Sequence, residues 1–136
     1  MRNAFNFEKR MGETMRIHPA VKELEQELVR IRRYLHQIPE PGYEEHKTHH
    51  YIYNFLSDLS FDKVERIAQT GIRAVMYGRN SERTVAFRAD MDGLSIQEAT
   101  DCPYASIHKG MMHACGHDGH MTILLGIALL VSRYKH

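Results

Sequence analysis

Hydrophobic side chains recur at steps of three or four near the start of the chain, as expected for one side of an α-helix. Between residues 19 and 35 charged side chains occupy the other sides, and the apolar positions are Val21, Leu24, Leu28, Ile31 and Leu35. Pro19 suits the first turn, because the N–H that it lacks would be unpaired there anyway. Pro39 and Pro41 end the helix, because the residue before a proline is pushed out of the helical region. The pattern predicts an amphipathic surface helix.

A second helix and three strands are predicted further along. The helix covers residues 44–57, and its inner side is formed by Tyr51, Ile52, Phe55, Leu56 and Leu59. From residue 61 the period changes to short runs rich in Val, Ile, Phe and Tyr, which predict strands at 63–68, 73–77 and 84–88. The third run is apolar without alternation, so we expect an interior strand with both faces covered.

A long connection separates the third predicted strand from a final helix. It runs from Asp90 to Gly116, and connections of this length are uncommon unless they are functional. The final helix, residues 118–134, is apolar on nearly every side, so we expect it to be covered all round. Helices, then strands, then a buried helix predict an α/β layer fold. Residues 1–18 have no clean period and are expected to form a loosely held leader, either ordered or disordered, before a domain at 19–136.

Composition narrows the classes of function. The chain has 136 residues, 18 Lys+Arg against 17 Asp+Glu, and a formal net charge of +1. This balance gives no drive toward phosphate backbones or anionic lipids, so neither a nucleic acid nor a membrane is an expected partner. No apolar signal stretch is visible, and the two cysteines are too few for a disulfide framework. We therefore expect a cytoplasmic protein with one compact domain.

Candidate chemistry begins at the end of the third predicted strand. Asp90 and Asp92 stand two residues apart in the run Arg88 to Gly93. Open α/β sheets place their ligand crevices at the carboxyl ends of strands. The two carboxylates are therefore either associated with a metal or solvated residues at a strand end.

The segment just before the final helix is the strongest candidate for a metal site. It holds Cys115 and His117, which are separated by one glycine, and thiolate and imidazole are the ligands that borderline-soft divalent ions select. The positive end of the helix dipole also favours a thiolate over a thiol. We expect His113 and His120 to be supporting or surface residues and Asp118 to be an N-cap. A redox-reactive Cys115 without metal is a further alternative.

Three motifs, taken in order, resemble the amidohydrolase branch of the M20 metallopeptidase family. They are RYLHQIPEPGYEE at 33–45, RADMDGLSIQE at 88–98 and MHACGHDGH at 112–120. By physics alone, the first motif is a helix end, a proline turn and a helix start. The resemblance implies an α/β fold class, as the N-terminal part of a mixed-sheet, zinc-peptidase-like catalytic domain that is incomplete here.

The resemblance also implies an activity and roles for particular residues. Members of this branch cleave the amide bond of N-acyl amino acids or small peptides at a centre of two divalent ions, which are Mn, Zn, Co or Ni. Cys115 and His117 match the first two metal ligands. Asp92 matches the aspartate that orients a ligand from behind, and Asp90 falls next to the site with no assigned role.

The sequence also departs from the family pattern. Family members are much longer. After the helix that corresponds to residues 118–134 they continue with a glutamate pair, which supplies the general base, and with further ligand histidines, none of which is present here. We therefore expect the N-terminal third of such an enzyme, inactive alone. The alternative is a non-catalytic metal-binding or interaction module. The apolar final helix also predicts an exposed patch, so a homo-oligomer or a complementary fragment is an expected partner.

Overall fold

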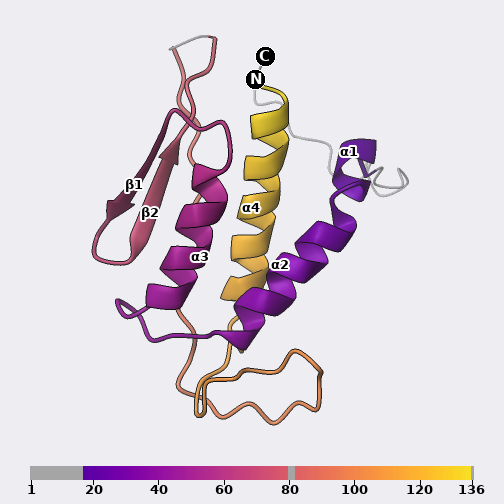
Figure 1. Ribbon diagram of the computed structural model, residues 1–136, viewed down its shortest axis with the longest axis vertical. Coiled ribbons are helices and arrows are strands. Elements are labelled where there is room, and N and C mark those ends of the chain that lie inside the picture. The colour runs from indigo at the N-terminus through magenta and orange to yellow at the C-terminus, as the bar shows by residue number, and fades with distance from the viewer. Residues whose placement is uncertain (1–16, 80–81, 136) are drawn as a thin grey trace, which may run out of the picture.

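The computed structural model describes residues 17–79 and 82–135, and the expected leader falls largely outside them. Three long helices lie side by side, with a β-hairpin next to α3 (Figure 1). In chain order the elements are α1 (Pro19–Lys22), α2 (Glu25–Gln37), α3 (His46–Ser57), β1 (Lys63–Ile67), β2 (Gly71–Val75) and α4 (His117–Arg133). The arrangement is a mixed fold of helices and one short sheet, which agrees with part of the expected α/β class.

The first predicted helix is divided into two. α1 ends at Lys22 and α2 begins at Glu25, with Leu24 buried at the junction. No glycine or proline between residues 20 and 30 predicts a break in the helix. The turn lets both α1 and α2 contact α4, so the break is an effect of tertiary packing.

The sheet is a single antiparallel hairpin. β1 pairs with β2 in a register that runs from Lys63 opposite Val75 to Ile67 opposite Gly71. The prediction of a third, interior strand at 84–88 is wrong for the described part of the chain. Val85 and Phe87 are 75% and 60% exposed. An extended segment becomes a strand only when another strand pairs with it, and the described residues provide none for this one.

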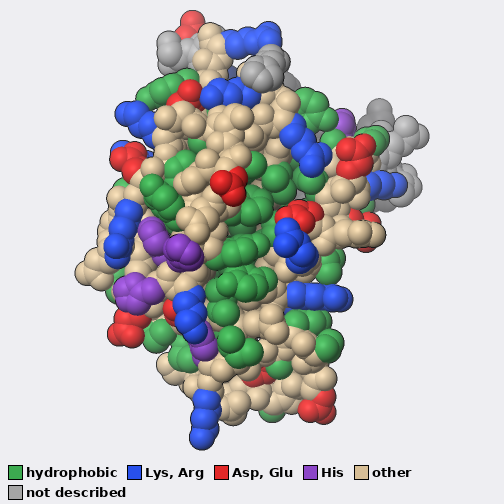
Figure 2. All heavy atoms as spheres, in the orientation of Figure 1, with side chains coloured by type: hydrophobic (Ala, Val, Ile, Leu, Met, Phe, Trp, Pro, Cys, Tyr) green, Lys and Arg blue, Asp and Glu red, His purple; other side chains and the backbone are tan. Residues whose placement is uncertain are grey.

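The hydrophobic core lies where α2, α3 and α4 meet. Its buried members are Ile31, Leu35, Ile52, Leu56, Met121, Leu125 and Ala128. The burial of α4 on every side, which its apolar pattern suggested, is incomplete. Ile123 and Val131 remain exposed, in line with the exposed patch that this helix predicts. Figure 2 shows hydrophobic side chains gathered along the middle of one face of the molecule. Within residues 17–79 and 82–135, no helix is long and apolar enough to cross a membrane.

The proline turn between α2 and α3 carries a carboxylate that caps the next helix. Glu40 accepts hydrogen bonds from the backbone N–H groups of Lys47 and Thr48, at 3.0 and 2.9 Å. The Thr48 hydroxyl donates to the same carboxylate at 3.0 Å. A carboxylate at the N-terminal end of a helix accepts hydrogen bonds from free N–H groups and interacts favourably with the positive end of the helix dipole. This cap fixes the turn on which the long loop rests.

The loop 90–116 closes the end of the molecule where α2 ends and α3 and α4 begin (Figure 1). The backbone N–H of Gly93 donates to the carbonyl of Glu40 at 2.8 Å. Leu94 and Met112 form an isolated antiparallel bridge that holds the two limbs of the loop together. The first and last residues of the loop are therefore brought close to each other, although they are far apart in sequence.

Candidate metal centre

A tight turn leads the chain from the loop into α4. Gly116 stands before the first helical residue with a φ of 90°, a left-handed conformation that residues with a side chain rarely adopt. Cys115 precedes this turn and His117 begins the helix. The glycine between them therefore allows both side chains to face the same side of the turn.

Both side chains reach Asp92 on the opposite limb of the loop. The Cys115 Sγ lies 3.8 Å and the His117 Nδ1 3.0 Å from the main-chain carbonyl oxygen of Asp92. The His117 Nδ1 is also 3.1 Å from the carboxylate of Asp92. The structure thus brings together the three residues singled out from the sequence.

Asp92 is held in place by the residue that follows it. A Cβ on Gly93 would lie 2.6 Å from the Cβ of Pro39, so only glycine fits this approach without a shift. The loop can therefore rest directly on the proline turn. Asp90 is placed differently, since its carboxylate pairs with the exposed Arg88 and takes no part in this group.

The donor set suits a divalent metal. The Asp92 carbonyl and carboxylate hold Nδ1 of His117, so the other ring nitrogen is the one offered to an ion. A carboxylate or carbonyl behind a ligand histidine is the usual device for fixing its orientation. Thiolate and imidazole together favour zinc and neighbouring borderline ions. The arrangement can hold an ion from one side, and further ligands would be needed to complete its coordination.

His113 is the least expected residue of this region. It is 3% exposed, and neither ring nitrogen has a hydrogen-bond partner. Burial lowers the pKa of His113, and this effect outweighs the nearby carboxylates of Asp118 and Asp92, which raise it. His113 was expected to be either a surface residue or a residue that supports the metal site, and the first of these is therefore wrong. His120 is exposed.

Asp118 is not the N-cap that its position suggested. The cap of α4 is Gly116, and the Asp118 side chain is buried in the first turn. It lies 2.6 Å from the Nδ1 of His36 and 3.1 Å from the Nε of Arg32. Sequence reasoning missed this group, because His36 looked like an ordinary residue at a helix end.

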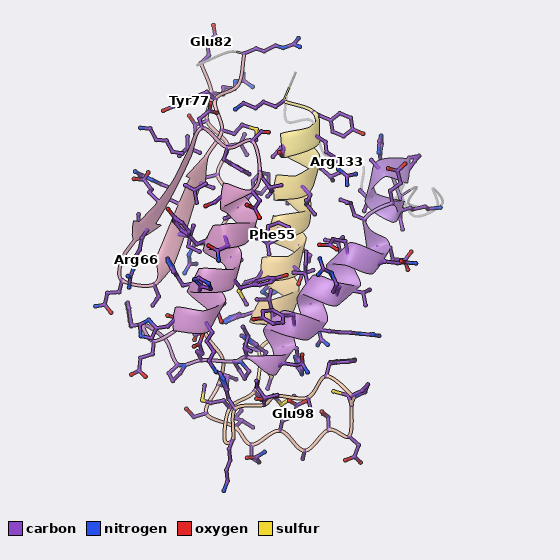
Figure 3. All side chains as sticks on the ribbon, in the orientation of Figure 1. Phe55, Arg66, Tyr77, Glu82, Glu98 and Arg133 are labelled. Atoms are coloured by element: carbon purple, nitrogen blue, oxygen red, sulfur yellow. The ribbon has the colours of Figure 1, made fainter. Side chains whose placement is uncertain are left out.

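The other ring nitrogen of His36 faces a second carboxylate. Its Nε2 lies 3.3 Å from the Oε1 of Glu98, which stands on the long loop below the end of α2 (Figure 3). Burial alone would raise the pKa of Glu98, but hydrogen bonds from Thr100, from the N–H of Ser106 and from His36 outweigh it, so this pKa is lowered. Among the described residues, His36, Glu98 and Cys102 form one group whose possible ligand atoms all lie within 4.8 Å of one another.

The chain is similar in sequence to known metallopeptidases. Residues 86–136 match the model of peptidase family M20/M25/M40. The chain is 53% identical over 103 residues to the N-acetyldiaminopimelate deacetylase of Bacillus pumilus, a match that covers 75% of this chain and 27% of that protein. It is 50% identical over 105 residues to the enzyme of that name from Halalkalibacterium halodurans, over 76% and 28% of the two chains.

Solved structures agree with these matches. A protein of methicillin resistant Staphylococcus aureus matches with a TM-score of 0.80 and 39% identity, over 85% of this chain and 31% of that one. A dinuclear metal-binding peptidase of the M20 family from Bacillus subtilis matches with a TM-score of 0.78 and 36% identity, over 84% and 32%.

The resemblance to the amidohydrolase branch of the M20 peptidase family is therefore confirmed. The fold is that of part of an M20 peptidase structure. The chain spans about 27% of the length of the curated relatives that it matches.

Proposed function

We propose that this chain carries part of the metal centre of a cytoplasmic amidohydrolase, with Cys115 and His117 as ligands and Asp92 orienting His117. The observation that supports this proposal is the convergence of the Cys115 Sγ and the His117 Nδ1 on the carbonyl oxygen of Asp92, at 3.8 and 3.0 Å. Similarity to a dinuclear metal-binding peptidase supports a centre of two divalent ions, which are Mn, Zn, Co or Ni.

The proposed substrate is an N-acyl amino acid or a small peptide. Its basis is the similarity to N-acetyldiaminopimelate deacetylases, whose name says that they remove the acetyl group of N-acetyldiaminopimelate. When bound, the ions would polarise the amide carbonyl and lower the pKa of a bound water. The residues of this chain hold and orient: Cys115 and His117 bind an ion, while Asp92 and the close contact of Gly93 fix the ring of His117.

The 136-residue chain is proposed to bind metal but not to turn over substrate by itself. Two ligands from one turn are too few for a catalytic dinuclear centre, and the resemblance assigns the general base to residues that this sequence lacks. We expect no metal-dependent hydrolysis of N-acetyl or N-benzoyl amino acids above background. Hydrolysis that a chelator abolishes would contradict this part of the proposal.

Metal binding itself is tested by protection of a thiol. The chain has two cysteines, so Cys102→Ser leaves Cys115 as its one thiol. We expect Mn²⁺ or Zn²⁺ to slow alkylation of Cys115 in this variant, because a coordinated thiolate is a weaker nucleophile. His117→Ala should abolish the protection, and Asp92→Asn should weaken metal affinity about 10–100-fold. An alkylation rate that neither metal changes would refute the site.

A further inference from the structure

We propose that His36, Glu98 and Cys102 form a second metal site, which binds one zinc-like ion and fastens the long loop to the end of α2. His36 lies in the last turn of α2, and the other two residues lie on the loop. This group shares no ligand with Cys115 and His117. This proposal is therefore independent of the function proposed above.

The distances match the edges of a tetrahedral zinc site. The His36 Nε2 and the Glu98 Oε1 are 3.3 Å apart, and the Glu98 Oε1 and the Cys102 Sγ are 3.8 Å apart. Zinc bonds of about 2.0–2.1 Å to N or O and about 2.3 Å to S give tetrahedral edges of about 3.4 and 3.6 Å. The third edge, between His36 and the Cys102 Sγ, is within 4.8 Å, so the sulfur would have to move toward the ring when an ion binds.

The orientation of His36 favours a cation beside its Nε2. Its Nδ1 lies 2.6 Å from the carboxylate of Asp118, so the proton on Nδ1 is donated there. In the neutral ring, Nε2 then presents a lone pair to the carboxylate of Glu98, which is also an acceptor. Two acceptors at 3.3 Å require a positive charge between them, either a second proton on the ring or a metal ion. A carboxylate behind a ligand histidine is the arrangement common in metal sites.

The charge balance of the group points the same way. The side chains of Glu98 and Asp118 are only 3% and 2% exposed, and Arg32 contributes one positive charge by pairing with Asp118. One cation does not neutralise two buried carboxylates. The Thr100 hydroxyl lies within reach of both the Glu98 carboxylate and the Cys102 Sγ, but it has only one proton to donate.

The donor set defines the class of ion. Thiolate, imidazole and carboxylate together select Zn²⁺ and similar borderline ions over Mg²⁺ and Ca²⁺, which prefer oxygen ligands alone. Cys102 is half-buried, so an ion can reach it, and water can take the fourth position. The bound ion would link two loop residues to α2 and so restrict movement of the segment between them.

The site is tested in the Cys115→Ser chain, where Cys102 is the one thiol left. Alkylation by iodoacetamide is followed with and without Zn²⁺, with Mg²⁺ as the control ion. At a Zn²⁺ concentration ten times Kd, about a tenth of the thiol stays free, so we expect the rate to fall about tenfold. Glu98→Gln in the same background should remove the protection, because the amide keeps the shape of the side chain but not its charge.

An alkylation rate of Cys102 that Zn²⁺ leaves unchanged would overturn the proposal, and the second proton on His36 would then account for the geometry. Protection that survives Glu98→Gln unchanged would also overturn it. If Cys115→Ser impairs folding, the two alkylated peptides of the unsubstituted chain are separated by mass spectrometry, which reads Cys102 and Cys115 independently. Loss of the Cys115 site alone would leave this proposal intact.

Discussion

The carboxylate of Asp118 lies 2.6 Å from the Nδ1 of His36, although 82 residues separate them in the sequence. The contact joins the first turn of α4 to the last turn of α2, and both side chains are buried. It links two of the three sequence motifs directly. Asp118 therefore holds together the end of the fold on which the candidate metal centre is built.

Removal of this carboxylate should destabilise the chain strongly. Asp118→Ala removes the acceptor that His36 and Arg32 share, and leaving buried donors without their partner costs about 1–3 kcal/mol. Asp118→Asn, which keeps one oxygen acceptor, should cost less. The measurement is the free energy of unfolding in urea for the three chains. Equal stability of Asp118→Ala and the unsubstituted chain would show that the contact contributes nothing.

Two glycines of neighbouring motifs should respond in opposite ways to alanine. A Cβ on Gly93 meets Pro39 at 2.6 Å, so we expect Gly93→Ala to cost about 1–3 kcal/mol and to displace Asp92. Gly119, in the first turn of α4, has open space around its Cβ position. Gly119→Ala should therefore be neutral or stabilise the helix by up to about 1 kcal/mol. Thermal melting of both variants tests the difference, and equal losses would contradict the close approach at Gly93.

The hydrogen bonds that the Asp62 side chain accepts should make a pH-dependent contribution to the free energy of unfolding. Hydrogen bonds from the N–H of Tyr77 and from Lys135 lower the pKa of Asp62 below its ordinary value of 3.8. A lowered pKa in the folded state stabilises the fold above about pH 4, and this contribution is lost as the pH falls through the folded-state pKa. Asp62→Ala should thus be less stable than the unsubstituted chain near pH 7. The difference in unfolding free energy between the two chains should shrink toward zero as the pH falls below 3.8 and through the lowered folded-state pKa. A difference that stays constant with pH would refute the effect.

The exposed apolar segment at 85–87 should cause self-association. Val85 and Phe87 are 75% and 60% exposed, and an unpaired extended segment offers its backbone to other chains. We expect Val85→Lys combined with Phe87→Ser to reduce oligomers or aggregates in sedimentation experiments. A monodisperse, cooperatively melting monomer before any substitution would contradict this expectation and favour the alternative of a self-contained binding module.

The periodic patterns predicted the elements that form from residues close together in the sequence. The apolar steps around Ile52 and Leu56 predicted α3 to within two residues of its observed bounds, and those around Ile31 and Leu35 predicted a helix but not its division into α1 and α2. These side chains form the core. The two strands of the hairpin were predicted for the same reason, the second one two residues late, but their pairing was not predicted. The segment 84–88 failed because an apolar run shows strand propensity but does not show whether a pairing strand is present.

For the candidate site, sequence order gave the residues and the tertiary structure decided their partners. The spacing of Cys115 and His117 around one glycine is local, so it could be found in the sequence, and the three motifs carried the family resemblance. The burial of His113, the pairing of Asp118 with His36 and the approach of Glu98 to His36 could not be found in this way. Each depends on the path by which the long loop returns to the end of α2, and that path is fixed by packing between residues far apart in the chain.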